Sequence, residues 1–101
     1  KAMDVFAIMD ARILALQQLR CDDLVTETKR RMFQTAAWQY CLARKGGYQA
    51  ETAQLKQRIL NGTKEKNLPL SGQYRILHKV AGKVPAAIGL YYYTRRLTRK
   101  T

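Results

Sequence analysis

The chain has 101 residues, which is enough for one small domain, and its 47% share of apolar residues is typical of a globular protein and not of a disordered one. The longest apolar run covers residues 84–93, about half the length that a membrane-spanning helix needs. The net charge of +12 is uneven: residues 1–65 contain eleven Lys or Arg and seven Asp or Glu, whereas residues 66–101 contain eight Lys or Arg and no acid. The C-terminal third therefore suits an anionic partner, whether lipid headgroups, nucleic acid or an acidic protein surface; the plain alternative is a solvated basic surface.

Residues 2–20 predict the first helix, because Phe6, Met9, Ile13 and Leu16 recur at helical spacing and form one apolar stripe. Few positions of this segment are polar, which indicates a helix that is well buried or that faces a partner outside the chain. The link to the next helix is only a few residues long, so the two helices should pack as an antiparallel hairpin.

Residues 22–45 predict the second and best-specified helix. Asp22 or Asp23 can cap its start, and Gly46-Gly47 should end it. Two apolar stripes run along it: Val25, Met32, Phe33, Ala36, Tyr40 and Ala43 on one side, and Leu24, Trp38 and Leu42, with Thr35 at their edge, on the other. A helix that is apolar on two sides is expected to lie between neighbours, so this helix should be the central one.

Residues 48–60 predict a third helix whose inward side chains are Tyr48, Thr52, Leu55, Ile59 and Leu60, and Asn61-Gly62 is a suitable end. Residues 63–70 are mostly polar and contain a proline, which is typical of a linker. No stretch shows the apolar and polar alternation of a strand. Residues 1–62 are therefore expected to form a three-helix core.

Residues 72–81 and 86–100 predict the last two helices. Ser71 can cap the first of them, and its apolar set is Tyr74, Leu77 and either Ala81 or Val80. Gly82 should end it, and Pro85 fits the first turn of the next helix. Residues 71–101 are therefore expected to form a basic helical hairpin, and the whole fold is predicted to be all-α, a small bundle of about five helices.

The sequence offers little for catalysis or metal binding. His78 is the single histidine and has no Cys or carboxylate at a ligand spacing, so we expect it to face solvent or to cap a helix. Cys21 and Cys41 would lie roughly 30 Å apart if one helix joins them, too far for a disulfide. We predict no catalytic, cofactor-binding or metal-binding residue in this chain.

Two features of the C-terminal third point to a binding role. Aromatic rings followed by cations suit the interface of an anionic membrane, and this cluster consists of Tyr91, Tyr92, Tyr93, Arg95, Arg96, Arg99 and Lys100. The alternative is that the tyrosines pack on the preceding helix and the cations are solvated. Residues 73–96 also have the order of a helix-turn-helix, which would make Arg95 and Arg96 nucleic-acid contacts. A plain helical hairpin explains the same pattern.

Residues 1–45 resemble the segment that follows the catalytic domain in bacterial family-2 glycosyltransferases of the GT-A fold. The residues that fit the pattern of those proteins are Met3-Asp4, Arg12-Ile13, Asp23-Leu24-Val25, Lys29–Arg31, Trp38 and Tyr40. Residues 71–100, with a helix, a proline and a Tyr-rich basic end, are similar to the C-termini of the same family.

The resemblance implies that the chain is the non-catalytic C-terminal region of a longer protein, which also fits a sequence that begins at Lys1 and enters a helical pattern at once. The parent would transfer a sugar from a nucleotide-sugar donor, with a divalent metal, in cell-surface polysaccharide synthesis. The nucleotide-sugar pocket, the Asp-x-Asp metal motif and the catalytic base would lie upstream. The first two helices would pack on that catalytic domain, and the protein would be cytoplasmic and peripheral at the inner membrane face. A small basic nucleic-acid-binding module that uses residues 71–101 is the alternative.

Overall fold

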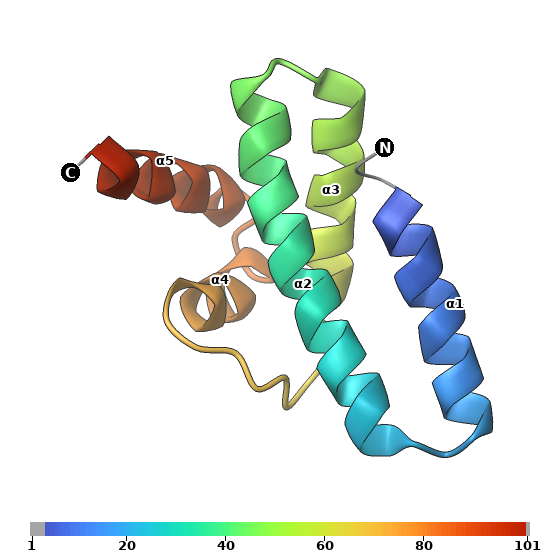
Figure 1. The fold of residues 1–101 in the computed structure, drawn as a ribbon. Helices are drawn as coiled ribbons and strands as arrows, with labels where there is room; N and C mark the ends of the chain where they lie inside the picture. The colour runs from blue at the N-terminus through green and yellow to red at the C-terminus, as the bar shows by residue number, and fades with distance from the viewer. Residues whose placement is uncertain (1–3, 101) are drawn as a thin grey trace.

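The computed structural model describes residues 4–100, with side chains described as far as residue 97. Its described part consists of five helices without a strand, so the predicted all-α class is confirmed (Figure 1). The helices are α1 (Asp4–Gln18), α2 (Asp22–Lys45), α3 (Gln49–Gly62), α4 (Gln73–Ala81) and α5 (Ala87–Lys100). None of these helices combines the length and the apolar character that crossing a bilayer requires.

Glycines mark the helix ends that were predicted from them, whereas the predicted side-chain caps do not form. α2 has the predicted bounds and ends at Gly46, after which Gly47 takes a φ of 75°, a conformation that costs glycine little. The predicted caps by Asp22 or Asp23 and by Ser71 are wrong, because α2 and α4 show no side-chain cap hydrogen bond. Asp22 and Asp23 instead occupy the first turn of α2, where their charge suits the helix dipole.

Two smaller boundary predictions also change. α3 continues to Gly62, two residues beyond the predicted end at residue 60. Pro85 precedes α5 instead of lying in its first turn, and its carbonyl oxygen accepts a hydrogen bond from the Ile88 backbone N–H at 3.1 Å. Proline is therefore used here to shape the turn between α4 and α5.

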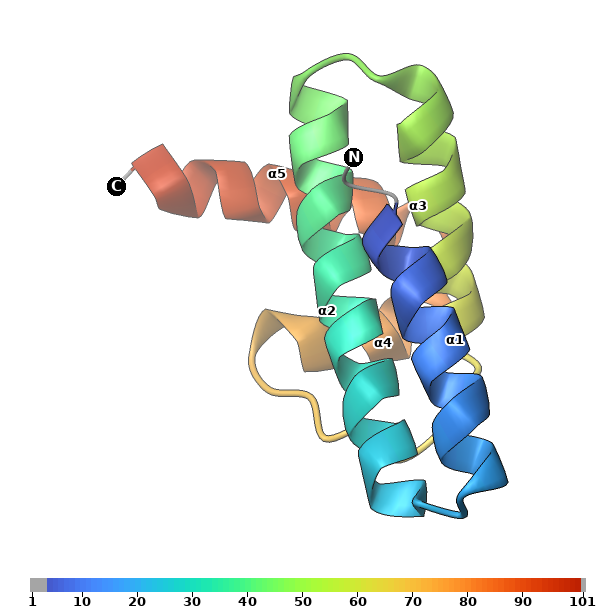
Figure 2. The ribbon, with the colours of Figure 1, turned by 45° about the vertical axis from the view of Figure 1, so that its right-hand side comes forward.

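The helices form two layers. α1, α2 and α3 run up and down as neighbours, and α2 is the central helix, as predicted (Figure 2). α4 and α5 lie on the other side of this layer, where α5 crosses α2 steeply. On the α1 side, Arg58 of α3 places its guanidinium carbon 4.6 Å from the centroid of the Phe6 ring and forms an ion pair with Asp10 at 3.2 Å. These contacts join α1 to α3 as well as to α2.

One hydrophobic core extends from α1 to α5. Its largest fully buried side chains are Phe6, Leu55, Ile59 and Ile88, and Leu70 of the predicted linker belongs to it as well. α2 supplies most of the remainder. Phe33, Ala36, Tyr40 and Ala43 of its first apolar stripe are among these residues, so the predicted inward direction of that stripe is confirmed. The core therefore includes side chains from all five helices, and the α4–α5 hairpin is packed on the three-helix layer.

Three inward predictions are wrong. Leu24 and Leu42 of the second α2 stripe are exposed: Leu24 lies near the start of α2, away from α5, and Leu42 lines an open groove between α2 and α5. Tyr48 is 61% exposed, since it precedes the first turn of α3 and does not share the inward face of that helix. Of the two residues left open on α4, Ala81 is buried and Val80 is exposed.

Candidate functional site

The three consecutive tyrosines of α5 have three different environments. Tyr91 is 7% exposed, and the centroid of its ring lies 6.2 Å from that of Tyr74 on α4. Tyr92 is half-buried, with the guanidinium carbon of Arg44 at 5.4 Å from its ring centroid. Tyr93 is 63% exposed. Successive residues of a helix point about 100° apart, so only Tyr93 of this cluster presents its ring to a surface partner.

Arg95 holds α5 against α2. Its guanidinium carbon lies 4.2 Å from the centroid of the Trp38 ring, and its Nη1 donates a hydrogen bond to the Tyr91 hydroxyl at 3.2 Å. Arg96, the next residue, is exposed. Arg99 and Lys100 lie outside the residues whose side chains the structure describes. The predicted cluster is therefore divided between packing and exposed positions.

Burial sets the protonation of the Tyr91–Arg95 pair. Burial raises the pKa of the Tyr91 phenol well above its ordinary value, helped by the neighbouring Tyr74. Burial also acts to lower the pKa of Arg95, but the Tyr91 and Tyr74 hydroxyls outweigh it and the net shift is upward. The pair is thus a neutral phenol that accepts from a charged guanidinium, which is a packing interaction and offers no acid or base for catalysis.

An exposed apolar strip covers the outer face of the hairpin. Ile76 and Val80 of α4 and Leu90 of α5 line a shallow groove of about 250 Å³ between the two helices. Leu97 lies two helical turns beyond Leu90 and is 60% exposed. Tyr93 lies between these leucines on the same side of α5. We call the outer residues Ile76, Val80, Leu90, Tyr93 and Leu97 the apolar strip.

The apolar strip is not evident from residues that are adjacent in the sequence, because its members are three to seven positions apart within each helix. A usable signal was present, since Leu90 and Leu97 stand at positions i and i+7, and Ile76 and Val80 at i and i+4. That spacing marks one face of each helix. It does not say whether the core or the solvent covers the face.

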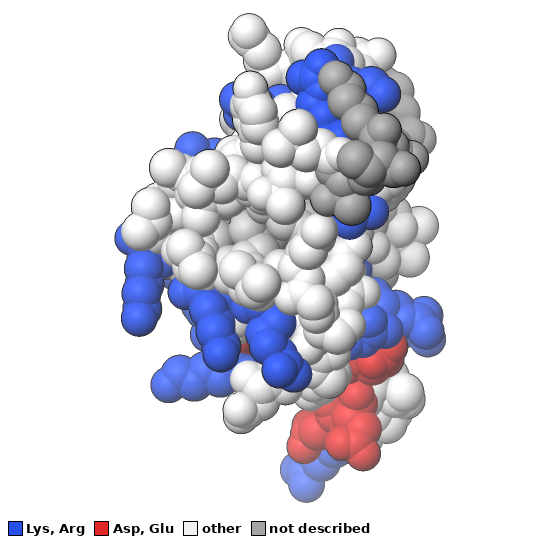
Figure 3. All heavy atoms as spheres, turned by 90° about the vertical axis from the view of Figure 1, so that its left-hand side faces the viewer, with Lys and Arg blue, Asp and Glu red and all other residues white. Residues whose placement is uncertain are grey.

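Cations flank the apolar strip. Arg75, Lys79, Lys83 and Arg96 of the hairpin are exposed, and no acid occurs in residues 66–101 to neutralise them. Figure 3 shows the face of the molecule on which the end of α5 points toward the reader. Lys and Arg side chains are distributed around this face. Its visible acidic side chains gather at the lower end, at the level where α2 begins in Figure 1. The hairpin thus combines apolar side chains with uncompensated positive charge.

His78 connects α4 to the segment 63–70 and to α2. Its Nε2 lies 2.7 Å from the carbonyl oxygen of Glu65, which accepts a hydrogen bond, and its ring packs edge-on against Phe33 with centroids 5.4 Å apart. Glu65 lies beyond the end of α3, so His78 contacts a carbonyl of the segment 63–70 and the predicted helix-capping role is wrong. Within residues 4–100, no three His, Cys, Asp or Glu side chains come close enough to hold a metal ion.

Comparison with known proteins adds no relative. No protein-family model, no curated protein and no solved structure matches this chain.

Proposed function

We propose that the α4–α5 hairpin attaches the protein to the surface of an anionic membrane, lying in the interface without crossing the bilayer. The observation that carries this proposal is the apolar strip, which is exposed and flanked by cations in a stretch with no acid. Interfacial helices have this composition, because their apolar side chains enter the boundary of the acyl chains while their cations meet lipid phosphates.

The magnitudes support a reversible attachment. Each cation near an anionic surface contributes about 1 kcal/mol, so Arg75, Lys79, Lys83 and Arg96 supply several kcal/mol at low salt. Leu90 and Leu97 each add about 1.5–3 kcal/mol if they leave water completely. Neither contribution is sufficient alone, since screening by salt weakens the first and partial burial weakens the second.

The resemblance of residues 1–45 leads to the second part of the proposal. The chain would be the non-catalytic C-terminal region of a glycosyltransferase, and its upstream catalytic domain would hold the nucleotide-sugar and the divalent metal at the inner membrane face. The exposed side of α1 offers a surface for that domain, with Ile8 68% and Leu19 71% exposed on the side of the helix opposite to Phe6 and Ile13. The hairpin would then keep the catalytic domain close to its membrane-bound acceptor.

The outer face of α5 argues against the nucleic-acid alternative. A recognition helix in a groove of duplex DNA presents polar and basic side chains outward. The outward side chains of α5 here include Leu90, Tyr93 and Leu97; Arg96 is also exposed, but Arg95 turns inward to Trp38. The same observations fit an interfacial helix, whose outward side chains enter the lipid.

Vesicle co-sedimentation tests the attachment. We expect the chain to bind vesicles of phosphatidylcholine and phosphatidylglycerol, and the double variant Leu90→Ser, Leu97→Ser to bind at least about ten-fold more weakly, because two apolar contacts are lost. The matched control is Leu14→Ser, Leu19→Ser, in which Leu14 of α1 and Leu19, directly after α1, are 62% and 71% exposed, against 68% and 60% for Leu90 and Leu97. The control should bind as the unaltered chain does.

Four outcomes would overturn parts of the proposal. Absence of binding to the anionic vesicles, or an equal loss in the control variant, would remove the membrane role. Salt-sensitive binding to duplex DNA that is unaffected by Leu90→Ser, Leu97→Ser would favour the nucleic-acid module instead. Sequencing the reading frame upstream of Lys1 tests the parent: alternating strands and helices with an Asp-x-Asp after a strand support it, and a start codon directly before Lys1 excludes it.

A further inference from the structure

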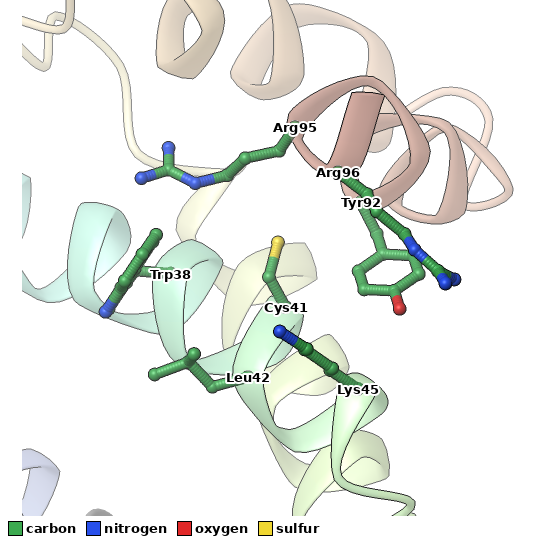
Figure 4. Close-up of a pocket in the computed structure, with 7 residues that line it drawn as sticks. All are labelled: Trp38, Cys41, Leu42, Lys45, Tyr92, Arg95 and Arg96. Carbon is green, nitrogen blue, oxygen red and sulfur yellow. The ribbon is translucent and has the colours of Figure 1, made fainter. Parts of the chain in front are cut away.

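A second surface lies on the inward side of α5, where it crosses α2. A groove of about 410 Å³ separates the two helices, and its main lining residues are Trp38, Leu42 and Lys45 from α2 and Tyr92, Arg95 and Arg96 from α5 (Figure 4). In Figure 4 the Arg95 side chain reaches across the groove toward Trp38, and Tyr92 and Lys45 extend from opposite sides. Its volume falls within the range of small-molecule sites.

The groove concentrates positive charge without a counterion. Lys45, Arg95 and Arg96 line it, and no acid does. None of the ion pairs formed among the described residues includes any of these three cations. Arg44 adds a fourth positive charge near its edge, over the ring of Tyr92. Like charges that line one groove repel one another, so an anion bound in the groove would stabilise the arrangement.

Arg95 carries a second, independent sign of a missing acceptor. Its Nε is buried and has no hydrogen-bond partner in the described structure, although its Nη1 donates to Tyr91. A buried donor without an acceptor costs about 1–3 kcal/mol. A ligand oxygen in the groove would supply an acceptor beside the guanidinium.

The rest of the lining is suited to the organic part of such a ligand. The Trp38 ring forms one end of the groove, Leu42 is 39% exposed on the α2 side, and Tyr92 lies opposite on α5. Aromatic and aliphatic surface of this kind accepts a planar ring or a short apolar chain. Arginine forks match the oxygens of phosphate groups especially well.

We propose that this groove binds a phosphate ester, with the phosphate held by Lys45, Arg95 and Arg96 and the organic substituent lying against Trp38 and Leu42. The phosphate can belong to a soluble nucleoside phosphate or to a phospholipid headgroup, since both present the same group. The proposal does not rest on the membrane attachment, because Tyr92 and Arg95 are on the inward side of α5, whereas Leu90 and Leu97 are on its outer side.

Trp38 is the only tryptophan of the chain, so its fluorescence reports on the groove directly. The 101-residue chain is titrated with inorganic pyrophosphate, with ADP and with a short-chain phosphatidic acid below its micelle concentration, at constant ionic strength. We expect a saturable change for ADP or phosphatidic acid and weaker binding of pyrophosphate, which lacks the organic part. Saturation by ADP identifies a soluble phosphate ester as a ligand, and saturation by phosphatidic acid alone identifies the lipid headgroup.

Two exposed cations make the decisive variant. Lys45→Gln, Arg96→Gln should weaken binding at least about ten-fold, because each loses a charge-assisted contact and neither side chain is part of the core. The control for overall charge is Arg12→Gln, Lys56→Gln, which also removes two exposed cations, one from α1 and one from α3, and should change nothing. Leu90→Ser, Leu97→Ser should leave these affinities unchanged even where it abolishes vesicle binding, which separates this proposal from the previous one.

The proposal is overturned if none of the three phosphate probes gives a saturable change. It is also overturned if Arg12→Gln, Lys56→Gln weakens binding as much as Lys45→Gln, Arg96→Gln, because both variants lose two charges and the effect would then come from net charge alone. A third contrary result is equal affinity for ADP and for sulfate at the same ionic strength, since it would show that the groove selects neither phosphate nor the organic part.

Discussion

Ile88 and Leu90 are two residues apart on α5, yet the structure assigns them opposite roles. Ile88 is 0% exposed, whereas Leu90 is 68% exposed. Truncating a buried isoleucine to alanine removes apolar contacts and leaves a cavity, which costs about 2–5 kcal/mol. For Ile88→Ala we expect a loss of about 3 kcal/mol in the free energy of unfolding, a large part of the stability of a small domain. Leu90→Ala should change it by no more than about 0.5 kcal/mol.

Urea denaturation monitored by Trp38 fluorescence measures both effects, because Trp38 lies beneath Arg95 at the contact of α2 with α5. With a urea m-value of about 1–3 kcal/mol per molar, the midpoint for Ile88→Ala should fall by about 1–3 M. The melting temperature should fall by about 12–24 °C, at 4–8 °C per kcal/mol for a domain of this size. The midpoint for Leu90→Ala should stay close to that of the unaltered chain.

In the vesicle assay Leu90→Ala should have the larger effect and Ile88→Ala the smaller one. Leu90→Ala should bind anionic vesicles more weakly, and Ile88→Ala, below its melting temperature, should bind as the unaltered chain does. Equal destabilisation by the two variants would refute the reasoning, because it would mean that α5 buries the face on which Leu90 lies. A variant Ile88→Ala as stable as the unaltered chain would be equally contrary.

Two further predictions concern stability. Gly62→Ala should destabilise the chain by about 1–2 kcal/mol, because a Cβ there would lie 2.5 Å from Cδ1 of Phe33 and the overpacking exceeds the gain in helix propensity. Gly89→Ala should stabilise the chain by about 0.5–1 kcal/mol, because the space around its Cβ is open. Urea midpoints that shift in the same direction would contradict this pair. Hydrogen bonds from Arg30, followed by the charges of Arg30 and Arg31, lower the pKa of Glu27 from 4.5 to about 2. Because the pKa of Glu27 is lower in the folded chain, its ionised carboxylate stabilises the fold at pH values above 4.5, and this contribution is lost as the pH falls from 4.5 toward 2. Glu27→Gln should therefore be less stable than the unaltered chain at neutral pH and equally stable near pH 2. A difference in the free energy of unfolding that does not change with pH would refute this prediction.

Much of the fold follows from local patterns in the sequence. The stripe through Val25, Phe33 and Tyr40 predicts the buried side of α2, and Gly46 predicts the end of that helix. Both depend on residues within a few turns of one another, where helical periodicity is a reliable guide. The predicted side-chain caps were wrong where a neighbouring residue could take the N-cap position instead. At the start of α4 this residue is Gly72, which follows Ser71.

The exposed surface of α5 was harder to predict from the sequence than the helices were. Tyr91, Tyr92 and Tyr93 form one group in the sequence, but a helix turns about 100° per residue and separates them onto different faces. Leu90 and Leu97 carry the spacing of a single face, and that spacing alone does not identify the face as exposed. Deciding this requires knowing which side of α5 meets α2.

The all-α class, the number and approximate bounds of the helices, and the concentration of positive charge in residues 66–101 can be read from the amino-acid sequence. These properties depend on composition and on interactions between near neighbours in the chain. The fold was needed to show that Arg95 lies over Trp38, that the second stripe of α2 stays partly exposed, and that Lys45 and Arg96 line one groove. Those outcomes depend on how α5 crosses α2, and the crossing is set by side chains that are distant in sequence and meet only when the core closes.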